Sequence, residues 1–152
     1  MPHYFLALLF FAGLFSHAQA QHSRLDGLWE GTMIIGGLEG VERLPMQLYL
    51  STEGRTVEGR SYVTLPDGSI LRMDLRGQHF RDGSIELREV AFAGDPVNDL
   101  MPEFNRQYQI VLTDDIWDPV LNGYWQEVTK EVFKKRRRLG RMALERRKTD
   151  GA

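Results

Sequence analysis

Apolar residues recur at every second position in short runs along this chain, which is the spacing of β-strands rather than of helices. The run from Leu44 to Leu50, for example, has an apolar residue at each alternate position. Turn residues such as Asp82-Gly83 separate the runs, because glycine supplies the positive φ angle of a tight hairpin. The pattern predicts an all-β protein of about eight strands, near residues 27–36, 42–52, 56–65, 69–80, 83–92, 106–113, 119–128 and 139–148.

Eight strands suit an antiparallel up-and-down barrel, with a two-sheet β-sandwich as the alternative, because both folds share the same alternation. The last strand has a competing interpretation, since residues 127–147 also fit an amphipathic helix through Val128, Val132 and Leu139. Gly140 would lie inside that helix and would cost ~1 kcal/mol relative to alanine. We therefore expect a strand there, and one barrel domain over residues 21–152.

A glycine motif recurs in the predicted strands, at Gly27, Gly59, Gly77 and Gly123. In each copy an apolar residue stands two positions before the glycine, and an aromatic residue stands two or three positions after it. Glycine weakens a strand unless the sheet must bend sharply there, as it does at the corners of a barrel. Unrelated bulges are the alternative. We expect the glycines to let one sheet curl around an aromatic-rich interior.

The first twenty residues differ from the rest of the chain. They contain no charged side chain, and the stretch from Tyr4 to Phe15 is almost entirely apolar. It ends in the small-x-small triplet Ala18-Gln19-Ala20, which is typical of a signal peptide cleaved between Ala20 and Gln21. A membrane anchor and a buried first helix are the alternatives, but a span needs ~20 apolar residues. We expect export to the periplasm or the cell exterior, with no membrane-spanning segment after cleavage.

Residues that bind metals or carry out catalysis are scarce. The chain has no cysteine, so neither disulfides nor thiolate ligands are available. His22 and His79 are the histidines that follow the predicted signal peptide. Asp114, Asp115 and Asp118 could hold calcium, but they do not have the spacing of the twelve-residue calcium loop and are better explained as a solvated loop. We expect no metal, no cofactor and no enzymatic activity.

The sequence Gly27-x-Trp29 in the first strand of a small secreted β protein resembles the lipocalins and the wider calycin group. The resemblance implies that Trp29 lies across the closed end of the barrel, with an arginine from the end of the last strand packed against its ring. Arg146 and Arg147 are the two candidates for that arginine. The disulfides and C-terminal helix of lipocalins are missing, so the resemblance implies a calycin-like barrel rather than a lipocalin proper.

Charge is distributed unevenly along the chain. Residues 130–148 carry ten Lys or Arg against two Glu, a net charge of +8, whereas residues 21–129 carry nine Arg against eighteen acids, a net charge of −9. This basic stretch is either a patch for an anionic partner, such as lipid head groups or polysaccharide, or the solvated tip of the last hairpin. Export argues against nucleic acid. The residues of the candidate patch are Lys134, Lys135, Arg136, Arg137 and Arg138.

Two functions remain open from the sequence, with an enzyme ranked last. In the first, the barrel binds a small apolar ligand, because eight strands enclose just enough room for one. The long connection over residues 93–105 would then cover the mouth with Leu100, Met101 and Phe104. In the second, side chains fill the barrel and its outer face or basic hairpin docks an anionic partner. The candidate cavity residues are Met46, Leu48, Val63, Tyr108 and Ile110.

Overall fold

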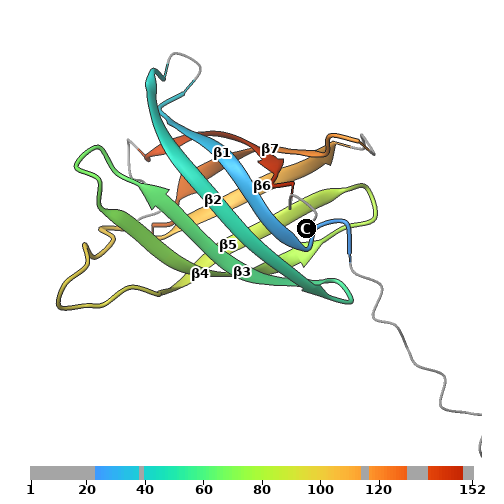
Figure 1. Cartoon of the computed structure of the whole chain (residues 1–152), viewed down its shortest axis with the longest axis horizontal. Coiled ribbons are helices and arrows are strands. Elements are labelled where there is room, and N and C mark those ends of the chain that lie inside the picture. Colours follow the sequence, from blue (N-terminus) through green and yellow to red (C-terminus); the bar gives the residue numbers. More distant parts are fainter. Residues whose placement is uncertain (1–22, 38–39, 114–116, 130–136, 149–152) are drawn as a thin grey trace, which may run out of the picture.

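The structure is a computed structural model that describes residues 23–37, 40–113, 117–129 and 137–148 (Figure 1). Each strand pairs antiparallel with the next along the chain, and the last strand closes back onto the first to complete a barrel. The strands are β1 (Gly27–Ile35), β2 (Glu42–Glu53), β3 (Thr56–Thr64), β4 (Ile70–His79), β5 (Ser84–Phe92), β6 (Arg106–Thr113), β7 (Val120–Glu127) and β8 (Leu139–Arg146).

The predicted fold class is confirmed, and the sandwich alternative is excluded by the pairing of β8 with β1. Every strand begins and ends within two residues of its predicted range. The segment with the competing helical interpretation forms β8, and no helix occurs among the described residues. The predicted signal peptide, including the cleavage site at Ala20 and Gln21, lies outside the described residues.

Antiparallel pairing sorts the connections into two ends of the barrel, which we call the base and the rim. The base carries the turn before β1, the β2–β3 and β4–β5 hairpins, the β6–β7 connection and the end of β8. The rim carries the β1–β2, β3–β4, β5–β6 and β7–β8 connections. In Figure 1 the β3–β4 hairpin and the long β5–β6 connection project to the left, at the rim.

Three of the four motif glycines lie inside strands that another backbone approaches closely. A Cβ atom added at Gly77 would lie 1.8 Å from the carbonyl oxygen of Glu86 on the neighbouring strand. At Gly59 and Gly123 the corresponding distances to a neighbouring carbonyl oxygen are 2.0 and 2.3 Å. No side chain fits in so small a space, so these positions let adjacent strands coil tightly around the barrel axis.

The fourth motif glycine has a different role from the one predicted. Gly27 opens β1 with a φ angle of 120°, and nothing lies within 4 Å of its Cβ position. The close approach in β1 occurs at Gly31, where an added Cβ would lie 2.1 Å from the carbonyl oxygen of Ala143. Gly140 in β8 is in the same situation, 1.8 Å from the carbonyl oxygen of Ile34. Neither Gly31 nor Gly140 is followed by the aromatic residue that defined the motif.

Candidate functional site

The five candidate cavity residues all point into the barrel, from β2, β3 and β6. Their exposed fractions are only 0–1%. A side chain lining a water-accessible cavity would retain accessible surface, so these side chains belong to the buried hydrophobic core. The structure therefore brings the five residues together, and they fill the space between the strands. They are Met46, Leu48, Val63, Tyr108 and Ile110.

At the base, the fully buried ring of Trp29 is held from two sides. Its indole Nε1 donates a hydrogen bond to the carbonyl oxygen of Leu25, at 2.9 Å. The guanidinium carbon of Arg146 lies 4.9 Å from the ring centroid, and the guanidinium also donates to the carbonyl oxygen of Arg24. Of the two candidate arginines, Arg146 contacts the ring, whereas Arg147 forms an ion pair with Glu30 at 3.2 Å.

At the rim, the guanidinium of Arg106 contacts two aromatic rings. Its central carbon lies 5.1 Å from the ring centroid of Phe104 and 5.5 Å from that of Trp125. Arg138 also contacts Phe104, at 4.9 Å, and forms a 2.9 Å ion pair with Glu103. Phe104 thus links the long β5–β6 connection to the start of β8. A sequence-based expectation placed Phe104 at a ligand mouth, and here it packs on arginines.

The other two mouth residues, Leu100 and Met101, remain about half exposed, at 52% and 53%. Their connection is tied to the barrel wall by an ion pair between Arg72 of β4 and Asp99, at 2.7 Å. It is tied to the rim by the backbone amide of Val128, which donates to the carbonyl oxygen of Asn105 at 2.8 Å. The β5–β6 connection is therefore held both by β4 and by the residue that follows β7.

A buried polar cluster lies just below the rim, where Glu89 of β5 meets Arg106 and Tyr108 of β6. The phenol of Tyr108 donates to Glu89 Oε1 at 2.6 Å, and Arg106 Nη1 donates to the same oxygen at 3.2 Å. Glu89 Oε2 accepts the backbone amide of Arg106 at 2.7 Å. Burial, and then the negative charge of Glu89, raise the pKa of Tyr108 well above its ordinary value.

The cluster fills a gap in the sheet. Strands β5 and β6 pair only from Ser84 opposite Val111 to Arg88 opposite Gln107. Beyond that point the Glu89 carboxylate accepts the strand amide that a neighbouring carbonyl would otherwise accept. Sequence reasoning missed this arrangement, because the contact of Glu89 with Arg106 depends on the register between β5 and β6. The cluster has almost no exposed surface, so its first role is to join the two strands.

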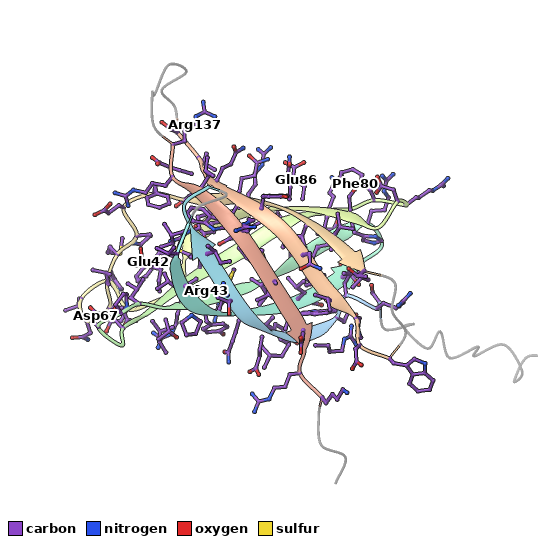
Figure 2. The ribbon with its side chains drawn as sticks, turned by 90° about the horizontal axis from the view of Figure 1, so that it is seen from above. Glu42, Arg43, Asp67, Phe80, Glu86 and Arg137 are labelled. Carbon is purple, nitrogen blue, oxygen red and sulfur yellow. The ribbon has the colours of Figure 1, made fainter. Side chains whose placement is uncertain are left out.

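A groove of about 530 Å³ lies on the outer surface of the barrel, over β6, β7, β8, β1 and the start of β2. The register places Ile34 of β1 between Arg43 of β2 and Arg141 of β8. Arg141 is in turn the register partner of Tyr124 on β7, and Tyr124 is the register partner of Gln109 on β6. These side chains therefore form one row across five strands. Figure 2 shows β8 between β1 and β7, with Arg43 beside β1.

The hollow forms because the next row toward the base consists of smaller side chains, Thr32, Ala143 and Asn122. Among the described residues that line the groove, the charged ones are Arg43 and Arg141. Arg43 comes from residues 21–129, which carry a net charge of −9 from nine Arg and eighteen acids, whereas Arg141 comes from the basic stretch 130–148. Sequence reasoning did not single out either residue, because they become neighbours only through cross-strand pairing.

The remaining described candidates, His79 and Asp118, do not contact each other and have separate partners. The described ranges contain no group of three His, Asp or Glu side chains that could hold a metal ion. His79 Nε2 lies 2.7 Å from the carbonyl oxygen of Gly54, and Asp118 forms a 3.0 Å ion pair with Lys148. Asp114 and Asp115 lie outside the described residues.

The basic run is only partly described. Lys134, Lys135 and Arg136 lie outside the described residues, whereas Arg137 and Arg138 are exposed at the rim. Figure 2 labels Arg137 beside the start of β8. Within the described ranges, no helix has the length and apolar character needed to cross a membrane.

The contact between Trp29 and Arg146 has the form that the lipocalin resemblance implied, with a ring from the first strand against an arginine from the last. No protein-family model, curated protein or solved structure matches the chain. The relation to calycins therefore stays a prediction from Gly27-x-Trp29, and function must be inferred from the geometry of the barrel itself.

Proposed function

We propose that the protein is a binding module that works through its outer surface, with a filled barrel serving as a rigid scaffold. One contrast supports this proposal most strongly. The five candidate cavity side chains have exposed fractions of 0–1%, whereas a groove of about 530 Å³ is open on the outer face. A partner reaches the groove without displacing any core side chain.

The closed ends of the barrel agree with this proposal. Arg146 packs over Trp29 at the base, and Arg106 packs between Phe104 and Trp125 at the rim. A ligand that entered the interior would have to break one of these contacts and then open a cavity in packed core. The groove residues, in contrast, belong to paired strands, which hold a binding surface more precisely than loops do.

The proposal is tested by placing a photo-crosslinking amino acid at Val111, in the groove, in protein produced in its native host. Val90 is the matched control, because it is also an outer-face valine, with an exposed fraction of 55% against 51% for Val111. Val90 is not among the groove-lining residues. We expect an adduct from position 111 and none from position 90, and the chemistry of the adduct, protein or carbohydrate, identifies the class of partner.

Equal adducts from both positions, or none from either, would contradict an outer docking groove. A parallel measurement addresses the small-ligand alternative. Uptake of an apolar fluorescent probe by the purified protein, abolished by Leu48→Trp in the fully buried core, would favour an interior site instead.

A further inference from the structure

We propose that the partner in the outer groove is an acidic polysaccharide that carries carboxylate groups on its sugar rings. This inference rests on the proposed outer docking function and names the chemistry of the partner. It follows from the charge, the spacing and the side-chain types of the row that crosses the strands.

The two groove arginines are placed to bind two carboxylates of one chain. Arg43 and Arg141 lie on either side of Ile34, two strands apart, and strands in a sheet are about 4.8 Å apart, so their backbones are separated by about 10 Å. That separation is comparable with the length of one disaccharide. Guanidinium groups bind carboxylates through two parallel hydrogen bonds, which gives both affinity and orientation. The groove therefore matches an anionic chain with repeating acidic groups.

The neighbouring side chains suit sugar rings. Tyr124 follows Arg141 in the row and is 64% exposed, so its ring offers an aromatic face to the apolar side of a sugar. Gln109 and Asn122 line the same groove, and each amide group both donates and accepts hydrogen bonds. A hydroxyl group likewise donates and accepts. Amides beside an exposed ring are thus well suited to a polyhydroxylated chain.

An acidic peptide fits the same surface less well. An extended peptide usually gains affinity by adding a strand to a sheet edge. The groove lies over segments of β1, β6, β7 and β8 that are paired with their neighbours, so it offers no such edge. The groove also crosses the strands, whose backbone groups are already used in the sheet. A peptide backbone would have to rely on side chains alone for its hydrogen bonds.

The experiment uses the full chain and polygalacturonate as the probe, with dextran as the uncharged polysaccharide and polyglutamate as the acidic peptide. Binding is measured by isothermal titration calorimetry at low and at high salt. We expect polygalacturonate to bind, dextran not to bind, and polyglutamate to bind at least tenfold more weakly. Binding should weaken as salt rises, because exposed charges are screened.

Three variants locate the binding site. Arg43→Gln and Tyr124→Ala should each weaken polygalacturonate binding roughly three- to tenfold, as expected for one charge-assisted contact or one ring contact. Arg88→Gln is the matched control, because Arg88 is an exposed arginine on β5 that does not line the groove. It should leave the affinity unchanged. Equal melting temperatures of all variants would show that each one folds.

Three outcomes would overturn the inference. They are polyglutamate binding as tightly as polygalacturonate, no loss of affinity in Arg43→Gln and Tyr124→Ala, and no polygalacturonate binding at all. The proposed function is tested separately, by the crosslinking experiment at position 111. A protein adduct at position 111 in the crosslinking experiment would leave the docking groove in place and exclude the polysaccharide.

Discussion

Arg146 lies over the indole ring of Trp29, with its guanidinium carbon 4.9 Å from the ring centroid, and the two residues are also direct register partners between β8 and β1. The contact that seals the base therefore also joins the two ends of the sheet. A second arginine and tryptophan, Arg106 and Trp125, occupy the rim. An arginine therefore contacts a buried tryptophan ring at each end of the barrel, and such a contact is favourable when it is shielded from water.

Removing the ring at the base should strongly destabilise the fold. Trp29→Ala leaves a cavity among fully buried neighbours, so we expect the free energy of unfolding to fall by ~3–5 kcal/mol. Arg146→Gln should cost only ~1 kcal/mol, because it removes the cation and keeps the ring. Urea unfolding monitored by circular dichroism measures both changes. A Trp29→Ala loss well below 1 kcal/mol would show that the ring does not close the base.

Adding a methyl group at a glycine that a neighbouring strand approaches closely should lower the free energy of unfolding. The loss should be larger where the neighbouring backbone is closer. Gly77→Ala would place a Cβ atom 1.8 Å from the carbonyl oxygen of Glu86. We expect a loss of about 1–3 kcal/mol or more, as for an overpacked site. Gly37→Ala is the control, since nothing lies within 4 Å of its Cβ position. Similar melting temperatures for the two variants would contradict the role assigned to Gly77.

The cluster at the gap between β5 and β6 should depend on its carboxylate. Glu89→Ala leaves the buried guanidinium of Arg106 without its ion-pair partner, so we expect a loss of about 3–5 kcal/mol. Glu86→Ala, on the outer face of the same strand, should cost less than about 1 kcal/mol. Hydrogen exchange adds a local readout, because the Arg106 amide donates to Glu89. Unchanged protection of that amide in Glu89→Ala would contradict the bridging role.

Tyr108 should make the fold sensitive to alkaline pH. Its pKa in the folded chain is raised well above the ordinary value of 10.0, first by burial and then by Glu89. Below the ordinary value both folded and unfolded chains keep the proton, and the full stability is present. As the pH rises beyond it, the unfolded chain loses the proton first, so the free energy of unfolding falls until the folded pKa is reached.

Tyr108→Phe removes this ionisation. The variant should be less stable than the parent near neutral pH by ~1 kcal/mol, because the hydrogen bond to Glu89 is lost. Its stability should then fall less steeply between about pH 9 and about pH 11 than that of the parent. Urea unfolding across this range measures both slopes, and parallel slopes would contradict the prediction. The other tyrosines are common to both proteins and cancel in the comparison.

The two described residues of the basic run should differ in their effect on stability. Arg137→Ser changes an exposed rim residue, so its melting temperature should match that of the parent. Arg138→Ser removes the contact with Phe104 and the ion pair with Glu103, so we expect a loss of about 0.5–1 kcal/mol. Differential scanning calorimetry separates the two variants. A large loss in Arg137→Ser would show that the run is packed.

The strands could be predicted because their signals are local. Alternating residues such as those from Leu44 to Leu50 need only one buried face, and Asp82-Gly83 needs only its own backbone preference. Trp29 was assigned to the closed end on the basis of three neighbouring residues. Gly31 could not be recognised from the sequence, because its role depends on the carbonyl oxygen of Ala143, a residue more than a hundred positions away.

The candidate sites could not be predicted, because their residues are far apart in the sequence and meet only in the folded barrel. The ion pair of Glu89 and Arg106 depends on where β5 stops pairing with β6. The groove arginines, Arg43 and Arg141, are on strands that meet a common neighbour only after the barrel closes. Alternation assigns a side chain to a face, but lateral neighbours across a sheet are set by register, which one sequence does not reveal.

The pairing of β8 with β1 also determines what a shortened chain would be. Without residues 139–146, the remaining seven strands would expose the outer edges of β1 and β7, each with a row of unpaired amides and carbonyls. Such a fragment is a template for adding further copies, so truncation would convert a sheet that closes on itself into a seed for polymers.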